Sequence, residues 1–194
     1  MTTVTEDYDR VSMHGIPRVL LERQADCLNL PLETVYIPKD CSIEEYGARM
    51  GKTLTRFKQD GVASVVFGDI FLEDVRKYRE DNLARIEMRA VFPLWGRNTA
   101  ALAKSFVVLG FEAIVTCIDV RALDKRFIGR ILNESFLSEL PPGVDPSGEN
   151  GEFHSFVLDG PIFKERVSCI PGEVILRDSF YFCDLLQNEK AITS

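Results

Sequence analysis

A single stretch, VASVVF at residues 62–67, decides the fold expected for this chain. It is an unbroken run of small, β-branched and aromatic residues, which is typical of a strand that is covered on both faces. The run stops at Gly68-Asp69, and a charged helical stretch follows. Strands of this kind with helices between them form parallel sheets, so the stretch predicts an α/β protein.

The segments around this stretch alternate between helix and strand. Ser42 and Glu45 form an S-x-x-E capping box at the start of one expected helix. Asn98 or Thr99 caps another. The other expected elements are helices over 17–29 and 72–83 and strands over 35–37, 89–92 and 113–118. Residues 1–119 are therefore expected to form one domain, a parallel sheet with crossover helices.

The pattern changes after residue 119. A helix is expected over 123–137, and a loop dense in proline, glycine and acidic residues follows it at 141–152. Strands are expected over 153–158, 162–170 and 173–183, with turns at 159–161 and 171–172 between them. Residues 120–186 are thus expected to form a small α+β part with antiparallel strands, and residues 187–194 a frayed tail.

Length, charge and composition exclude several classes of protein. A chain of 194 residues fits one domain, or one domain with a small appendage. Its formal charge of −7 repels phosphate backbones, which argues against nucleic-acid binding. The start of the chain, MTTVTEDYDR, lacks the basic and apolar regions of a secretory signal. The most apolar stretch, residues 106–118, is too short to cross a membrane.

The cysteines indicate a reducing compartment. The 5 cysteines are odd in number and scattered, no CxxC pair occurs, and only 2 histidines are available. A structural zinc site is therefore not expected. Mostly buried, reduced thiols in a cytoplasmic protein are the simplest interpretation.

Two expected strands end in polar residues, at Gly68-Asp69 and at Asp119. In open parallel sheets, ligands bind beyond the carboxyl ends of the strands. A glycine at such an end lets a ligand approach the backbone, because no Cβ is in the way. A plain turn between strand and helix is an equally good interpretation of Gly68-Asp69 taken alone.

Arg76 and Glu80 lie four residues apart on the expected helix that follows Gly68-Asp69. Such a pair is most often a solvated salt bridge worth about 0.2–0.5 kcal/mol. The first turns of this helix face the expected ligand edge, however. Arg76 could therefore hold a phosphate or carboxylate there by a two-pronged contact.

The densest cluster of polar residues is GENGEFH at residues 148–154. Its two glycines explain a turn, but a turn needs neither Glu149 nor Glu152. Both carboxylates, together with His154, could bind Mg²⁺ or act as general acid and base. A surface loop is the alternative interpretation. A lone histidine such as His14, in VSMHG, is more often a capping or core residue than a catalyst.

Read together, several motifs resemble one family. They are VTEDYDRVSMHG at 4–15, FGDIFLEDVRKYRE at 67–80, FPLWGR at 92–97, GFEAIVTCID at 110–119 and GENGEFHSFVLDGPIF at 148–163. They resemble the diphthine–ammonia ligases, which are N-type ATP pyrophosphatases of the adenine nucleotide alpha hydrolase superfamily. The similarity runs from about Thr2 to Leu186. Its most specific block corresponds to the family's Glu-Gly-Gly-Glu signature, with Asn150 in place of the first of the paired glycines.

The resemblance implies a fold and a reaction. The fold is a HUP-type, Rossmann-like α/β domain followed by a smaller domain that carries the signature. The reaction uses ATP and Mg²⁺, and ATP is cleaved between its α- and β-phosphates. The substrate, a small molecule or a protein side chain, has a carboxylate that becomes an acyl-adenylate with release of pyrophosphate. Ammonia then displaces AMP to give an amide. A homo-oligomer is a further possibility.

One family motif is missing from this sequence. Such proteins open with a strand that ends in a Ser-Gly-Gly-Lys-Asp-Ser loop, whose amides and lysine hold the pyrophosphate, and no such run occurs here. The resemblance therefore implies a domain without its first βα unit, in an N-terminally truncated member or in a non-catalytic nucleotide-binding relic. A missing inner strand leaves unpaired edges, so we expect low stability or self-association.

The family's motifs also assign roles to residues of this chain. Thr3, Thr5 and His14 lie in the stretch that flanks the adenine and ribose in such proteins. Gly68 and Asp69 close the strand beside the nucleotide.

The remaining assignments concern the substrate and the chemistry. Arg76 and Glu80 match a charged pair that binds substrate or phosphate. The signature supplies the other candidates: Glu149, Glu152 and His154 as catalytic residues, and Asn150 and Gly151 as substrate-binding residues. These role assignments require the turn near Asn150 to cover the end of the expected strand at Phe67.

Overall fold

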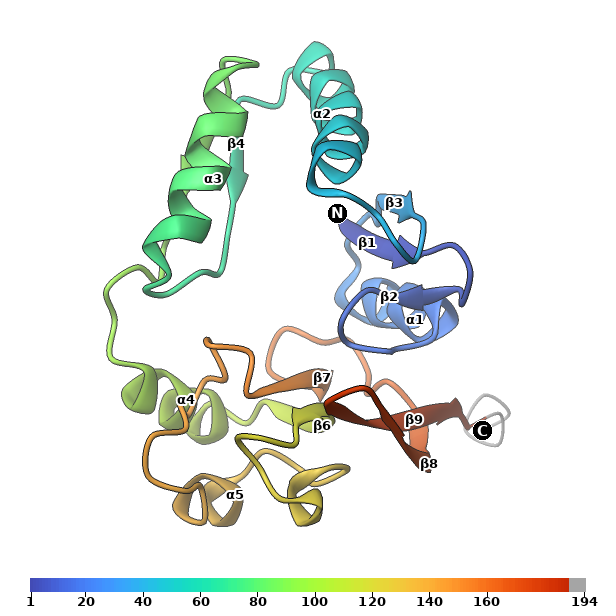
Figure 1. Ribbon diagram of the computed structural model, residues 1–194, viewed down its shortest axis with the longest axis vertical. Coiled ribbons are helices and arrows are strands. Elements are labelled where there is room, and N and C mark those ends of the chain that lie inside the picture. Colours follow the sequence, from blue (N-terminus) through green and yellow to red (C-terminus); the bar gives the residue numbers. More distant parts are fainter. Residues whose placement is uncertain (189–194) are drawn as a thin grey trace.

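The computed structural model describes residues 1–188 and has a mixed α/β architecture with three separate sheets (Figure 1). The first sheet has the order β2-β1-β3, and β1 is parallel to β3 and antiparallel to β2. The second consists of the parallel strands β4 and β5. The third is antiparallel, with the order β7-β6-β9-β8. The strands are β1 (Thr2–Thr5), β2 (Arg10–Val11), β3 (Thr34–Ile37), β4 (Ser64–Val66), β5 (Arg89–Val91), β6 (Glu112–Asp119), β7 (Phe153–Asp159), β8 (Cys169–Arg177) and β9 (Phe180–Gln187).

The first four helices begin within one residue of where the sequence predicts them. The Ser42 hydroxyl accepts a hydrogen bond from the Glu45 N–H, and the Asn98 side chain accepts one from the Ala101 N–H, so both expected caps are confirmed. The helices are α1 (Arg18–Leu28), α2 (Ile43–Gln59), α3 (Glu73–Ala84), α4 (Thr99–Val108) and α5 (Glu134–Ser138), with a 3-10 helix at Lys125–Phe127. In Figure 1, α2 and α3 stand at one end of the molecule, and the antiparallel sheet lies toward the other.

The expected single parallel sheet is wrong in its extent. The parallel pairs β1–β3 and β4–β5 form, but they belong to different sheets. The strand expected over 113–118 pairs with β7 and β9 instead, and its apolar residues are covered on one side by α1 and on the other by α4 and α5.

The stretch at 62–67 is also covered on one face only. Val65 packs on a cluster formed by Leu54, Leu83 and Met88, which lie on α2, on α3 and just before β5. Val66 points to the other face and is 66% exposed. That exposure shows that the second face is not covered, and in the described chain β4 pairs with β5 alone, so its other edge is open as well.

The helix expected over 123–137 is wrong. Only the short 3-10 helix and α5 form there. Gly129 has a positive φ of 74°, which breaks the helix, and the Asn133 side chain caps a new one by accepting from the Phe136 N–H. Between them, Ile131 forms a bridge with Ile114 of β6.

The last strands are shifted from their expected positions. The turn between β8 and β9 lies at Asp178, whose φ is 52°, rather than at Pro171-Gly172. Those two residues lie inside β8, at an irregularity in its pairing with β9. Residues 162–168, which were expected to be part of a strand, lie outside the strands. The tail expected from 187 begins one residue later, because Gln187 still belongs to β9, and 189–194 lie outside the described residues.

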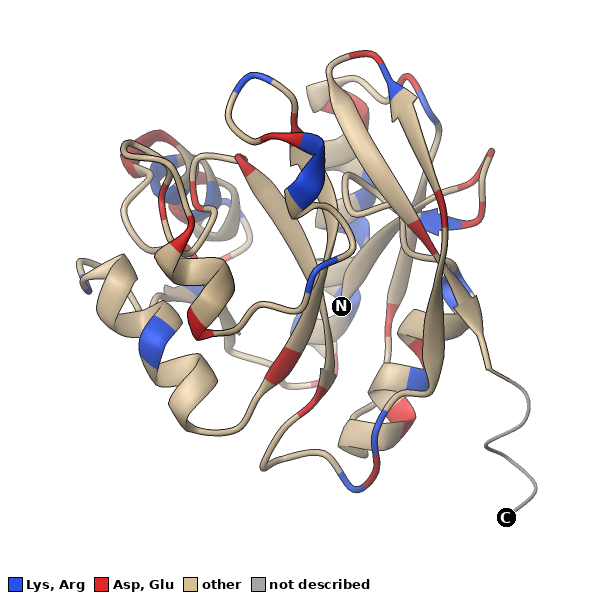
Figure 2. Cartoon of the chain, turned by 90° about the horizontal axis from the view of Figure 1, so that it is seen from below, with Lys and Arg blue, Asp and Glu red and all other residues tan. Residues whose placement is uncertain are grey.

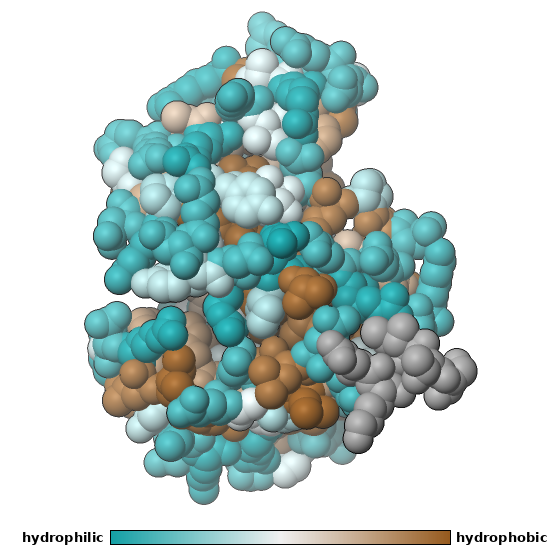
Figure 3. Space-filling model, turned by 90° about the vertical axis from the view of Figure 1, so that its right-hand side faces the viewer, coloured by the Kyte–Doolittle hydropathy of each residue, from teal (hydrophilic) through white to brown (hydrophobic). Residues whose placement is uncertain are grey.

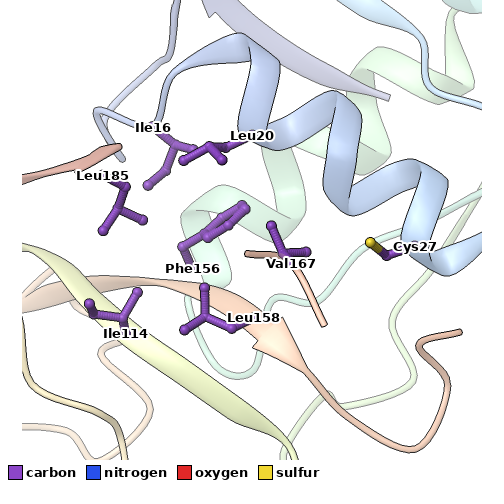
Figure 4. Close-up of a cluster of buried hydrophobic side chains, with 8 residues drawn as sticks. All are labelled: Ile16, Leu20, Cys27, Ile114, Phe156, Leu158, Val167 and Leu185. Atoms are coloured by element: carbon purple, nitrogen blue, oxygen red, sulfur yellow. The ribbon is translucent and has the colours of Figure 1, made fainter. Parts of the chain in front are cut away.

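Two hydrophobic cores hold the antiparallel sheet. One joins it to the N-terminal unit: Ile16, Leu20 and Cys27 from around α1 meet Ile114, Phe156, Leu158, Val167 and Leu185 (Figure 4). The other lies on the opposite face and includes Phe127, Phe136 and Phe153. The boundary expected after Asp119 stays a prediction, although β6, which ends there, pairs with strands that follow it.

No helix in the part of the chain that the structure describes is long and apolar enough to cross a membrane. All five cysteines are free thiols, and Cys27, Cys117 and Cys183 are buried. Acidic and basic residues are interspersed on the elements seen in Figure 2. An anionic ligand would therefore depend on individual cationic side chains rather than on a broad basic face.

Candidate functional site

The site is centred on the chain just after β4, at residues 67–70, which we call the rim. The Ile70 N–H donates a hydrogen bond of 2.6 Å to Oε1 of Glu149, and the Ile70 carbonyl accepts one of 2.8 Å from the Gly96 N–H. The signature loop (residues 148–154) therefore contacts the rim directly. This is the contact that the sequence interpretation requires.

The rim itself is fixed by an ion pair with α3. The Asp69 side chain is 12% exposed, and its Oδ2 lies 2.8 Å from Nε of Arg79. The two atoms are not aligned for a hydrogen bond, but Nη2 of Arg79 donates one to Oδ1 at 3.1 Å. The Arg79 guanidinium also lies over the Phe67 ring, 4.5 Å from its centroid. Arg79 was not among the expected site residues, since nothing in the spacing of Asp69 and Arg79 predicts the pair.

Arg76 lies on the same helix and is held by aromatic rings. Its Nε donates a hydrogen bond of 2.8 Å to Glu80, as the spacing predicts. Its guanidinium lies 5.0 Å from the Phe92 ring centroid and 4.6 Å from that of Trp95. The two Nη atoms make no hydrogen bond with any described residue. Arg76 therefore keeps donors for an anion while its position is fixed.

The signature loop is organised by Glu152, which is 8% exposed. Its Oε1 accepts hydrogen bonds from the Asp145 N–H and from Nδ2 of Asn150, and its Oε2 accepts one from the Asn150 N–H. Burial alone would raise the pKa of Glu152, but these hydrogen bonds hold that pKa below its usual value. Both carboxylate oxygens of Glu152 thus accept hydrogen bonds from the loop, and these hydrogen bonds fix the conformation of the loop.

Two further features fix this loop. Oδ2 of Asp145 accepts a hydrogen bond of 2.9 Å from the Glu149 N–H, so Asp145 is a site residue that the sequence interpretation missed. A Cβ at Gly148 would lie 2.7 Å from the Phe153 carbonyl oxygen, and the φ of Gly148 is 67°. Glycine is therefore required here, and the Asp-x-x-Gly spacing was the available signal for the turn.

The two histidines lie against each other. The ring of His14, in the turn between β2 and α1, lies 4.7 Å from that of His154 on β7, measured between centroids. Burial and, to a lesser extent, the neighbouring His14 lower the pKa of His154 to about 4. Burial also lowers the pKa of His14, against a backbone hydrogen bond with Ser155 that raises it. Both rings are therefore neutral at pH 7.

Thr3 and Thr5 lie on β1, away from the signature loop's contact with the rim. The hydroxyls of Thr5 and Ser12 lie 3.0 Å apart, and the Thr3 carbonyl accepts from the Ser12 N–H. Thr5 also lines a cavity of about 560 Å³ between the N-terminal hairpin and β8–β9. Tyr8, Lys39 and Arg177 line the same cavity.

The structure brings some of the expected residues together and leaves others apart. Gly68, Asp69 and Glu149 meet at the rim, and Gly68 has open space where a Cβ would be. His14 and His154 form a pair of their own. In the described residues, no three His, Cys, Asp or Glu side chains are placed to hold a metal ion, so Glu149, Glu152 and His154 do not form a metal centre.

Comparisons with known proteins show what this chain is similar to. Residues 98–190 match the family model described as diphthamide synthase C-terminal domain. The chain is 29% identical over 131 residues to the diphthine–ammonia ligase of Rattus norvegicus, a match that covers 64% of this chain and 49% of the relative. The chain is 28% identical over 131 residues to the diphthine–ammonia ligase of Homo sapiens. The chain is 28% identical over 175 residues to the diphthine–ammonia ligase of Danio rerio. That match covers 87% of this chain and 66% of the relative.

Most of these matches span about half the length of the curated relatives. The family model covers α4 and β6–β9 and includes the signature loop, whereas the rim at residues 67–70 lies outside it. The resemblance seen in the motifs is thereby confirmed: the chain is similar to the diphthine–ammonia ligases and, over residues 98–190, to the diphthamide synthase C-terminal domain.

Proposed function

We propose that this chain is an ATP-dependent, amide-forming ligase of the diphthine–ammonia ligase type. It activates a carboxylate as an acyl-adenylate and releases pyrophosphate, and ammonia then displaces AMP. The observation that carries this proposal is the hydrogen bond between Glu149 and Ile70, because it brings the signature loop to the end of a parallel strand. The proposal includes a HUP-type nucleotide-binding domain.

The residues at the rim have the chemistry that a nucleotide needs. The open space at Gly68 leaves the backbone accessible to a phosphate, and the free Nη atoms of Arg76 supply charged donors. We place the adenine end near Thr3 and Thr5, in the direction of β1.

Carboxylate oxygens at the rim also fit Mg²⁺. This ion is usually held by one or two carboxylates and by substrate phosphates. Glu149 keeps Oε2 free, whereas both oxygens of Glu152 accept hydrogen bonds. Both oxygens of Asp69 lie against Arg79, so Glu149 is the residue that would hold Mg²⁺, which would neutralise phosphate charge.

The reaction then has two steps. The substrate carboxylate attacks the α-phosphorus, an O–P bond forms, and pyrophosphate leaves. Ammonia attacks the acyl carbon, a C–N bond forms, the C–O bond to AMP breaks, and the nitrogen loses one proton. Arg76 stabilises the negative charge that develops in the first step.

ATP binding and pyrophosphate exchange test this proposal. Calorimetry is expected to show ATP binding with Mg²⁺, and labelled pyrophosphate is expected to enter ATP when the carboxylate substrate is present. Arg76→Ala should weaken binding at least tenfold, because a charge-assisted contact is lost. Lys77→Ala is the matched control, since Lys77 is the next residue of α3 and pairs only with Asp81 on the exposed face. Equal losses in the two variants would contradict the role of Arg76.

The alternative is a nucleotide-binding relic without turnover. Binding of ATP without pyrophosphate exchange would support the relic, and exchange would exclude it.

A further inference from the structure

A cavity of about 560 Å³ lies between the N-terminal hairpin, formed by β1 and β2, and the strands β8 and β9. This volume suits a small organic molecule, since ligand pockets in proteins usually measure about 300–1,000 Å³. Among the described residues that line it, Thr5 is the one that also belongs to the proposed nucleotide site. The cavity is therefore largely separate from that site.

Three residues of β8, Glu173, Ile175 and Arg177, line one wall of the cavity. They alternate along the strand, so their side chains lie in a row on one face. Phe182, the partner of Ile175 on β9, adds a second apolar side chain at the middle of the row. Four residues of strand separate the Cα atoms of Glu173 and Arg177 by about 13 Å. The wall thus runs from a carboxylate, over an apolar centre, to a guanidinium.

The end of the cavity at Glu173 has a surplus of negative charge. Asp184 lies at this end, because a Cβ on Gly172 would be 3.4 Å from the Asp184 Cβ. Nη1 of Arg10 lies 2.7 Å from Oδ1 of Asp184 and also donates to the Gly15 carbonyl, so the charges of Arg10 and Asp184 cancel. Glu173 is exposed and makes no ion pair or hydrogen bond with a described residue. Its carboxylate is therefore free to bind a cation.

The opposite end of the cavity has two cations beside the ring of Tyr8. The Arg177 guanidinium lies 5.7 Å from the centroid of this ring, and Nζ of Lys39 lies 5.8 Å from it. Asp178 is the carboxylate that lines this end, and together with Asp40 it acts electrostatically on Lys39. Arg177 forms no ion pair with a described residue, and its planar fork of donors fits a carboxylate. Arg177 is therefore the main anion-binding group of the cavity.

We propose that this cavity binds a small amphoteric molecule, whose carboxylate pairs with Arg177 and whose ammonium group pairs with Glu173. The apolar chain between the two charges lies along Ile175 and Phe182. Basic amino acids and ω-amino acids belong to this chemical class. The inference goes beyond the proposed function and uses neither ATP nor the ligation reaction.

The two ends together select a ligand that carries both charges. A molecule with a carboxylate alone would leave Glu173 without a partner, and one with an ammonium group alone would leave Arg177 without one. Glycine carries both charges, but it is too short to reach Glu173 and Arg177 at once. A chain of methylene groups, as in 6-aminohexanoate, spans the distance and is removed from water by the apolar centre of the wall.

Titration with 6-aminohexanoate, followed by backbone amide NMR without any nucleotide, tests this site. The amide signals of Tyr8, Glu173, Ile175 and Arg177 are expected to shift to saturation. Hexanoate and hexylamine each keep one charge and should bind at least tenfold more weakly, and glycine should shift nothing. If 6-aminohexanoate leaves these signals unchanged, or if hexanoate or hexylamine binds as tightly, the inference is wrong.

Variants of the two charged ends make the test specific. Arg177→Gln and Glu173→Gln should each weaken the binding of 6-aminohexanoate at least tenfold, because one charge-assisted contact is lost. The losses should be crossed for the singly charged probes. Arg177→Gln should leave the affinity for hexylamine within twofold of the original chain, and Glu173→Gln should do the same for hexanoate.

Two control variants separate recognition from net charge. Lys52→Gln on α2 and Glu134→Gln on α5 change the net charge by the same amounts, and both residues are exposed and do not line the cavity. They should bind 6-aminohexanoate within twofold of the original chain. Equal losses in the controls and in the cavity variants would overturn the site. Because no nucleotide is present, a chain that fails to bind ATP would refute the proposed function and leave this result standing.

Discussion

The Glu149 carboxylate accepts a hydrogen bond of 2.6 Å from the backbone N–H of Ile70, across 79 residues of sequence. It is the contact through which the signature loop meets the parallel strands. Glu149→Ala should lower the free energy of unfolding by about 1 kcal/mol, since the Ile70 N–H loses its partner. Glu149→Gln keeps an acceptor for the Ile70 N–H, so it should lower the free energy of unfolding by a smaller amount.

Hydrogen exchange at Ile70 is the measurement for this variant pair. The Ile70 amide should exchange faster in Glu149→Ala, while the Gly96 amide, which donates to the Ile70 carbonyl, should change less. Equal protection of Ile70 in the original chain and in Glu149→Ala would show that the contact is not populated in solution.

Glu152 should be a stability residue. Glu152→Ala leaves the N–H groups of Asp145 and Asn150 without their acceptor inside the loop, so we expect a loss of about 2–4 kcal/mol in urea denaturation. Glu152→Gln preserves one acceptor oxygen and should lose less than half of that. A Glu152→Ala variant as stable as the original chain would contradict this role.

Local signals were read correctly from the sequence. The caps at Ser42 and Asn98 and the strand after the GENGEFH loop depend on neighbours within a few residues, and all three are confirmed. Gly129 shows the limit of such patterns. The apolar spacing of 123–137 favours a helix, but the positive φ of Gly129 and the bridge from Ile131 to β6 depend on packing against the sheet.

The site was predicted in part. The signature loop and the rim were expected to meet, and Glu149 shows that they do. Arg79 was missed because its pairing with Asp69 depends on how α3 packs against the rim, whereas Asp145 was missed although the Asp-x-x-Gly spacing signals its turn. The pairing of β6 could not be predicted either, since a fully apolar strand fits a parallel and an antiparallel sheet equally well.

The histidine pair should make stability depend on pH. The folded pKa of His154 is about 4, below the value of about 6.5 for an unfolded histidine. Unfolded chains therefore bind more protons between these values, and the stability from the neutral ring is present above pH 6.5 and lost as the pH falls toward 4. The loss due to His154 should reach up to about 3 kcal/mol.

Urea denaturation between pH 4 and pH 7 measures this dependence. His154→Phe should flatten the profile, because the remaining ring then titrates without its partner. Carboxylates titrate at the lower end of the range, so the difference between the two profiles is the quantity to compare. Parallel profiles would show that burial of this ring does not control the titration.

Gly148 should tolerate no side chain. In Gly148→Ala, the new Cβ would meet the Phe153 carbonyl oxygen at 2.7 Å, and the positive φ would add strain. We expect a loss of about 2 kcal/mol or more in thermal denaturation. Gly151→Ala is the matched control, since its φ of 83° is also positive but its Cβ would meet nothing within 4 Å. Equal losses in the two variants would show that the clash contributes nothing.

The open edge of β4 should lead to self-association. In the described chain β4 pairs with β5 alone, and Val66 is 66% exposed on the uncovered face. An unpaired apolar edge attracts other strands, and lysine on such an edge opposes pairing. Val66→Lys should therefore shift the chain toward monomer in light scattering.

Two other surfaces make this test specific. Val108→Lys changes a residue of α4 that is 68% exposed, so it alters the net charge equally without touching β4. Figure 3 shows a hydrophobic patch on the face near the C-terminal end, and Leu176 on β8, 55% exposed, is an exposed apolar residue of the antiparallel sheet. Dissociation by Leu176→Lys but not by Val66→Lys would assign the contact to β8–β9. A monodisperse original chain that melts cooperatively as a monomer would remove the β4 edge as an association site.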